Sequence, residues 1–208
     1  MSGNIKRRKL ICGVGINDAP YSTLLGYTQE GKQIRCPFYT KWRSLIKRCY
    51  SETEWKQTNK HGYLKNAQYE FCKVVDEWHR FTNFKSWMEK QDWEGKHLDK
   101  DILVPGNRIY GPDTCMFIPP HINTMLVDQR PGKYPKGVSY DPRANLFFIR
   151  VRVNGKQTSK GCWKTAEEAG KKFIEFRINE IIEEANKLSD IKLKNALINY
   201  AKIKYENS

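Results

Sequence analysis

The strongest constraint on the fold of this chain is a run of alternating side chains in its C-terminal third. Apolar residues alternate there with aromatic and basic ones, in the order Phe147, Phe148, Ile149, Arg150, Val151, Arg152 and Val153. Successive side chains of a β-strand point to opposite faces of a sheet, so the run predicts a strand with one apolar and one cationic face. The Asn154-Gly155 pair that follows is typical of a tight hairpin turn.

Two more strands and a helix are expected around this run. Residues 138–140 and 157–163 have strand character, and the turn-forming residues 141–145 separate the first strand from the second. Thr165, followed three residues later by Glu168, predicts a capped helix start. That helix would run to about residue 187 and bury Ala169, Phe173 and Phe176. A last helix is expected over 191–205.

The first 128 residues predict a mixture of helices and short strands. The N-terminal segment over residues 1–37 is expected to be irregular apart from a hairpin over 27–34. Residues 51–66 are expected to form a polar loop. Residues 38–50 have apolar positions at helical spacing, with the basic residues Lys41, Arg43, Lys47 and Arg48 between them. The spacing over 71–88 predicts two short helices, broken near Thr82-Asn83, whose aromatic residues are mostly core.

A strand, turn, strand and helix pattern completes this part of the chain. Residues 96–103 and 108–110 predict a strand and a return strand around the turn at 105–107, 113–120 a third strand, and 121–127 a helix. The fold class is therefore α+β. The expected domains are an N-terminal arm (1–37), a helix-rich core (38–128), a sheet-and-helix domain (133–187) and a C-terminal helix (188–208).

Composition favours a nucleic-acid partner. The net charge of +14, with a pI near 9.5, attracts polyanions, and 12% of the residues are aromatic. No stretch approaches the roughly 20 apolar residues of a membrane span, and the basic start is not followed by the apolar segment of a signal peptide. We therefore expect a cytoplasmic protein with reduced cysteines. The six cysteines form no paired Cys-x-x-Cys spacing, which argues against structural zinc.

A series of residues from 97 to 123 resembles the ββα-metal core of phage HNH endonucleases. The resemblance rests on His97-Leu98-Asp99-Lys100-Asp101, Gly106-Asn107, the segment 110–117 (Tyr-Gly-Pro-Asp-Thr-Cys-Met-Phe) and Ile122-Asn123. It implies that Asp99 and Asn123 ligate one divalent cation, expected to be Mg²⁺, which would polarise a DNA phosphodiester for hydrolysis. Asp101, two residues after Asp99, would lie on the same strand face and share that metal.

The chain departs from this motif at two positions. Lys100 stands where the family has its general-base His, and Thr114 stands where an Asn orients that His. A lysine is ordinarily a proton donor, so Lys100 would instead bind phosphate. His97 and His121 are the candidate substitutes for the base. The alternative interpretation of residues 99–101 is a charged, solvated edge without chemistry.

Residues 133–184 resemble the AP2 DNA-binding domain. The resemblance rests on residues 134–140 (Tyr-Pro-Lys-Gly-Val-Ser-Tyr), the strand 147–153 and the segment 161–169 (Gly-Cys-Trp-Lys-Thr-Ala-Glu-Glu-Ala). It implies a three-stranded sheet laid in the major groove, with Trp163 packed between sheet and helix. Arg150 and Arg152 would read bases, because a guanidinium matches the guanine edge. The surrounding cations Lys136, Arg143, Lys156 and Lys160 would contact phosphates, as would those of the helix over 38–50.

Together the two resemblances favour a phage homing endonuclease that binds duplex DNA and acts in the bacterial cytoplasm. Two alternatives stay open at this point. The first is a catalytically inactive descendant that still binds DNA. The departures at Lys100 and Thr114 favour this alternative. The second is a phage protein that uses its basic face for RNA or for a host factor.

Overall fold

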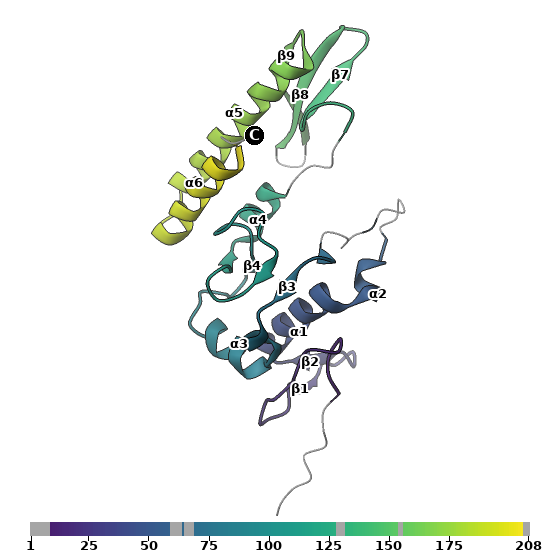
Figure 1. The fold of residues 1–208 in the computed structure, drawn as a ribbon, viewed down its shortest axis with the longest axis vertical. Coiled ribbons are helices and arrows are strands. Elements are labelled where there is room, and N and C mark those ends of the chain that lie inside the picture. Colours follow the sequence, from purple (N-terminus) through teal and green to yellow (C-terminus); the bar gives the residue numbers. More distant parts are fainter. Residues whose placement is uncertain (1–8, 59–63, 65–68, 128–131, 154–155, 206–208) are drawn as a thin grey trace, which may run out of the picture. The chain divides into compact units, whose positions relative to one another are not determined.

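The computed structural model describes residues 9–58, 64, 69–127, 132–153 and 156–205. The chain divides into two units, residues 1–119 and 120–208, and each is described by itself. Within the described residues it is an α+β protein with six α-helices and small sheets, most of them antiparallel (Figure 1). The fold class predicted from the sequence is confirmed.

The first unit is built around an aromatic core held by helices. These helices are α1 (Pro37–Tyr50), α2 (Glu52–Trp55), the 3₁₀ helix η2 (Asp76–His79) and α3 (Phe81–Met88). Trp42 of α1 is fully buried, and its indole N–H donates to the carbonyl oxygen of Trp78 at 2.7 Å. The Phe81 ring lies 5.5 Å from those of both Tyr39 and Trp42. Burial of these large rings is the main stabilising contribution in this unit.

Three two-stranded sheets surround this core. A hairpin joins β1 (Leu24–Tyr27) and β2 (Gln33–Arg35). The strands β3 (Lys73–Val74) and β5 (Ile109–Tyr110) pair in parallel. The strands β4 (His97–Asp99) and β6 (Met116–Ile118) pair antiparallel.

The predictions for this unit were right about some of its elements and wrong about others and about one strand pairing. The hairpin and the helix over 38–50 are confirmed. Residues 71–75 form a turn and the two-residue strand β3 rather than a helix, the break in the helices falls at Arg80, and α2 lies inside the expected loop. The return strand expected over 108–110 pairs with β3, not with β4, because a segment of two residues carries no pattern that selects its partner.

The second unit follows the sequence prediction closely. It contains α4 (Pro120–Leu126), then β7 (Val138–Asp141), β8 (Leu146–Val153) and β9 (Lys156–Trp163), and then α5 (Ala166–Asn186) and α6 (Ile191–Tyr205). The strands form one antiparallel sheet in the order β7-β8-β9. The helix α5 lies along this sheet, and α6 runs back beside α5 (Figure 1). The expected Asn154-Gly155 turn lies outside the described residues.

The sheet and α5 close over a small apolar core. Ile149 and Val151 of β8 are buried against Ala169 and Phe173 of α5. Thr165 caps α5, as predicted, because its hydroxyl oxygen accepts the Glu168 backbone N–H at 3.2 Å. These contacts turn one face of the sheet toward the helix and leave the opposite face outward.

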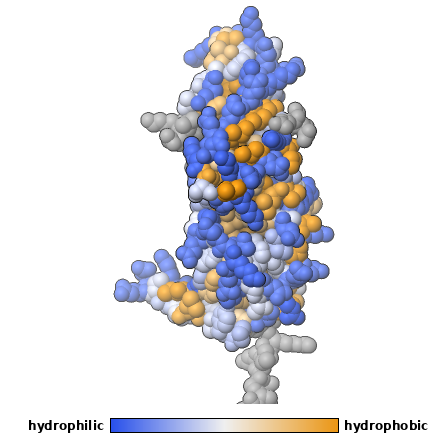
Figure 2. Space-filling model, turned by 90° about the vertical axis from the view of Figure 1, so that its left-hand side faces the viewer, coloured by the Kyte–Doolittle hydropathy of each residue, from blue (hydrophilic) through white to orange (hydrophobic). Residues whose placement is uncertain are grey.

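Among the described residues, none of the helices is long and apolar enough to cross a membrane. The face drawn in Figure 2 carries mostly hydrophilic side chains, with hydrophobic ones in patches between them.

Candidate functional site

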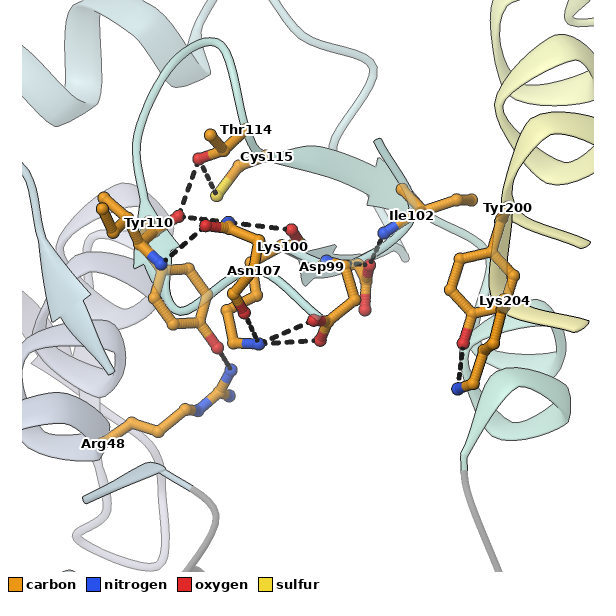
Figure 3. Close-up of polar contacts among 12 residues, drawn as sticks. Arg48, Asp99, Lys100, Ile102, Asn107, Tyr110, Thr114, Cys115, Tyr200 and Lys204 are labelled. Carbon is orange, nitrogen blue, oxygen red and sulfur yellow. Dashed lines mark hydrogen bonds and ion pairs between the residues drawn. The ribbon is translucent and has the colours of Figure 1, made fainter. Parts of the chain in front are cut away.

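The carboxylate of Asp99 forms a turn directly after β4. Its Oδ1 atom accepts the backbone N–H groups of Asp101 at 2.8 Å and Ile102 at 2.7 Å (Figure 3). The strand therefore ends at Asp99, and the alternation that would have put Asp101 on the same strand face does not continue. The sequence Leu-Asp-Lys-Asp folds this way because Asp readily bonds backbone groups two or three residues ahead.

Asp99 is a carboxylate in a largely desolvated position. Burial raises its pKa above the usual value, and the Asp101 carboxylate adds to the rise, while the two backbone N–H groups and the Lys100 charge oppose it. Removing a carboxylate from water disfavours its charged form. The fold thus places a negative charge where a bound cation would offset its desolvation cost.

Lys100 is tied into the loop that follows Asp99. Its side chain is only 11% exposed, and its ammonium donates to both Asp101 carboxylate oxygens, at 2.9 and 2.8 Å, and to the Asn107 carbonyl oxygen. The Asn107 amide group donates back to the Lys100 carbonyl oxygen at 3.1 Å (Figure 3). Lys100 therefore binds the loop 100–107 together and, in this arrangement, does not point a cation toward phosphate.

Asn107 and Thr114 extend the same network to β5. The Asn107 side-chain oxygen accepts the Ile109 backbone N–H at 2.9 Å, and the Thr114 hydroxyl donates to the Ile109 carbonyl oxygen at 2.7 Å. No role was predicted for Asn107 from the sequence. Asn107 follows Gly106, which has φ +78° and marks a turn, and Asn side chains in turns commonly bond nearby backbone groups. Thr114 fixes β5 rather than orienting an imidazole.

Of the candidate bases, His97 belongs to the same strand face as Asp99. Leu98, between them, packs with Phe117 into the aromatic core, so His97 and Asp99 lie on the opposite face of β4. Residues two apart on one strand are about 6.6 Å apart along it. His121, in the second unit, is held by Glu184, with 3.0 Å between Nε2 and the Glu184 carboxylate.

The metal ligands expected from the sequence come from different units. Asp99 belongs to the first unit, and Asn123 is a half-buried residue of α4 in the second. Within the described parts of the chain, no three His, Cys, Asp or Glu side chains gather closely enough to hold a metal ion by themselves. Carboxylate and amide oxygens are donor types that a hard divalent cation prefers, so the Asp99 carboxylate by itself is a suitable ligand type for Mg²⁺.

The outward face of the second unit's sheet carries exposed polar and cationic residues. Register places Phe148 opposite Cys162 and Arg150 opposite Ser159. The preceding residue, Phe147, packs toward α5, so Phe148 and Arg150 belong to the outward face. Arg150 is exposed, and its guanidinium carbon lies 5.8 Å from the centroid of the Phe148 ring. A guanidinium stacked on an aromatic ring is held flat while its N–H groups stay available.

The other predicted DNA contacts lie in several places. Arg143 is exposed at the β7–β8 turn, where its backbone N–H donates to Asp141 at 2.9 Å. Lys160 lies 4.9 Å from the Phe176 ring centroid, on the helix side of the sheet. Lys136 lines a hollow of about 350 Å³ together with residues of α5 and α6. The side chains of Arg152 and Lys156 lie outside the described residues.

The cations of α1 are mostly engaged within the first unit. Lys41 donates to the Lys96 carbonyl oxygen at 2.7 Å, Lys47 pairs with Glu54 at 3.6 Å, and Arg48 donates to the Tyr110 hydroxyl at 3.3 Å. Burial lowers the pKa of Lys41, and the charge of Arg48 adds to this effect. Arg43 is half-buried. The cations of α1 therefore stabilise the first unit, and the DNA surface that we propose does not include this helix.

No family model, no curated protein and no solved structure matches the chain.

Proposed function

We propose that the protein binds double-stranded DNA through the outward face of the β7-β8-β9 sheet. The distribution of charge in the second unit carries this proposal. Residues 133–164 contain eight basic residues and one acidic residue, Asp141, whose carboxylate is bonded within its own turn. The helix α5, on the other side of the sheet, contains six Glu and three basic residues. A polyanion is therefore attracted to the segment that forms the sheet more strongly than to α5.

The outward face also has the chemistry for contacts within a groove. A two- or three-stranded surface enters the major groove of B-DNA, and an arginine forms two parallel hydrogen bonds with a guanine edge. Arg150, held against Phe148, supplies that group at the centre of the sheet. Arg143 at the turn is placed for a phosphate contact.

We further propose that the first unit contributes a DNA-hydrolysing site of the HNH type. Within this unit Asp99 would be a ligand of a divalent cation, which would supply Lewis-acid polarisation of the scissile phosphate. The desolvated carboxylate of Asp99 supports this role. His97 is the side chain that we assign as proton acceptor, because it shares a strand face with Asp99.

A DNA-binding protein without cleavage is the second candidate. Lys100 occupies the motif position of the general base, and its ammonium is bonded to Asp101 and Asn107. An ammonium held by three acceptor oxygens donates protons and does not accept them. This observation favours a protein that keeps the DNA surface and has lost catalysis.

Binding is tested by gel shift of a duplex with the wild-type protein, Arg150→Ala and the control Lys172→Ala, which removes a cation from α5. We expect Arg150→Ala to weaken duplex binding by about 1–3 kcal/mol, with Lys172→Ala close to wild type. Equal effects of both substitutions would count against the sheet as the DNA surface.

Cleavage is tested with supercoiled DNA, with and without Mg²⁺ or Mn²⁺. Metal-dependent nicking that is lost in Asp99→Ala and His97→Ala supports the nuclease. Salt-sensitive binding without nicking makes the non-cleaving protein the working model.

A further inference from the structure

A second surface with nucleic-acid chemistry lies in the first unit, around β3. Residues 71–74 alternate between exposed and buried: Phe71 is 63% exposed, Cys72 is buried, Lys73 is exposed and Val74 is buried. Phe71, in the turn that precedes β3, and Lys73, in β3 itself, are thus the two residues of this segment that expose their side chains, while the other two residues belong to the core. The aromatic residues over 71–88 are mostly core, as predicted, and Phe71 is the exception.

The neighbouring strand adds a cation and an aliphatic side chain to this surface. Ile109 of β5, 47% exposed, is the register partner of Lys73, and the Lys73 backbone N–H donates to the Arg108 carbonyl oxygen at 2.8 Å. The guanidinium carbon of Arg108 lies 5.4 Å from the Phe71 ring centroid. We call these four residues, Phe71, Lys73, Arg108 and Ile109, the Phe71 face.

The Phe71 face is joined to the Asp99 loop by the hydrogen bonds already described. Ile109 bonds Asn107 through its backbone N–H and Thr114 through its carbonyl oxygen. Asn107 in turn bonds Lys100, which directly follows Asp99. A DNA strand held on the Phe71 face would therefore be held by residues hydrogen-bonded to the loop that follows the candidate metal ligand Asp99.

An exposed ring with cations beside it has the chemistry of a base-stacking platform. Every nucleobase has a π-face that stacks on an aromatic ring, while Lys and Arg beside the ring attract the phosphates of the same strand. The charge of the chain, +14, suits a polyanion much better than a second apolar protein surface.

We propose that the Phe71 face binds unstacked DNA by stacking a base on Phe71, with Lys73 and Arg108 beside the adjoining phosphates. The proposal rests on the DNA-binding function above and adds to it a second contact, specific for bases that have left the duplex stack. Such a contact would hold a single strand, or a locally opened duplex, next to the Asp99 loop.

The test uses the full chain and fluorescence anisotropy with labelled oligo(dT), beside the matching dT·dA duplex. Because stacking of one base contributes about 1–3 kcal/mol, Phe71→Ala should weaken oligo(dT) binding by about tenfold. The salt slope should stay unchanged, since no charge is removed. Phe71→Trp should retain the affinity, and Arg108→Ala should reduce the salt slope by about 1.

Tyr27→Ala is the matched control, because Tyr27 is an aromatic residue of the same unit and is 61% exposed. It should bind oligo(dT) like the wild type. The inference is overturned if Phe71→Ala binds oligo(dT) as tightly as the wild type, or if the wild type does not bind oligo(dT). If either result is found while Arg150→Ala still weakens duplex binding, DNA binding by the β7-β8-β9 sheet remains supported. If the wild type does not bind the duplex, DNA binding by that sheet is refuted independently of Phe71.

Discussion

Replacing Gly137 by alanine tests how the sheet of the second unit is held against α5. Gly137 has φ +73°, and its carbonyl oxygen accepts the Arg150 backbone N–H at 3.1 Å. A Cβ atom added there would lie 2.1 Å from Cε2 and 2.3 Å from Cδ2 of Phe173, a ring that is 6% exposed. The turn before β7 therefore needs glycine both for its conformation and for contact with the ring.

The expected destabilisation has two parts. The left-handed conformation costs an alanine about 1 kcal/mol. The Phe173 ring must also leave its place; complete loss of a buried Phe side chain costs about 3–5 kcal/mol, and partial displacement costs less. We expect Gly137→Ala to lower the free energy of unfolding of this unit by about 3 kcal/mol. Gly31→Ala, at φ +75° with no atom within 4 Å of the added Cβ, should lose only about 1 kcal/mol.

The assay is hydrogen exchange measured by mass spectrometry along a urea series, using peptides from β7 to β9 and α5 for the second unit. In a Phe173→Ala background the cost of Gly137→Ala should fall to about 1 kcal/mol, because the ring is gone. The reasoning is refuted if Gly137→Ala costs no more than Gly31→Ala, or if its cost is the same with and without Phe173.

Three further substitutions probe the first unit and the start of α5. Asp99→Asn should be more stable than the wild type at neutral pH. Burial raises the Asp99 pKa, so the folded state favours the protonated carboxyl group. The contribution of Asp99 to stability is therefore fully present below pH 3.8 and is lost as the pH rises through the raised pKa. Urea unfolding at several pH values should therefore show the two proteins converging in acid. Trp42→Phe should cost about 2 kcal/mol by thermal unfolding, because the buried Trp78 carbonyl loses its donor. Thr165→Ala should cost about 1 kcal/mol, with Thr165→Ser near wild type, because only the capping hydroxyl at Glu168 matters.

The second unit could be predicted from sequence because its signals are local. The alternation over 147–153 fixes which side chains of β8 face α5, and Thr165 fixes where the helix starts. Each signal acts within one element or across one short turn. The strand order β7-β8-β9 then follows from antiparallel neighbours joined by short connections.

The first unit could be predicted only in part, because its sheets join distant segments. Strand β3 pairs with β5 across a gap of more than thirty residues, and both have only two residues. The spacing of Phe71, Val74 and Val75 satisfies a helical pattern, whereas that of Cys72 and Val74 satisfies an extended one, and no nearby capping residue decides between them. The exposure of Phe71 depends on that choice.

The candidate site shows the same limit. The sequence picks out Asp99 and the residues around it by their order, and the turn at Asp99 agrees with the habits of Asp side chains. The hydrogen-bond partners of Lys100 could not be predicted, because Asn107 is seven residues away and meets Lys100 only once the loop has closed. The sequence pattern therefore selects candidate residues, and the folded loop determines their hydrogen-bond partners.

The most direct test of the central claim uses Cys162, an exposed thiol opposite Phe148 on the outward face of the sheet. In a Cys12→Ser background the other four cysteines are buried, so alkylation by iodoacetamide reports on this one position. The rate is measured with and without saturating duplex DNA, with complex formation verified by gel shift. Binding through the outward face predicts that DNA slows the alkylation of Cys162 several-fold. An unchanged rate in a complex known to have formed would contradict the account, because the DNA would then lie elsewhere.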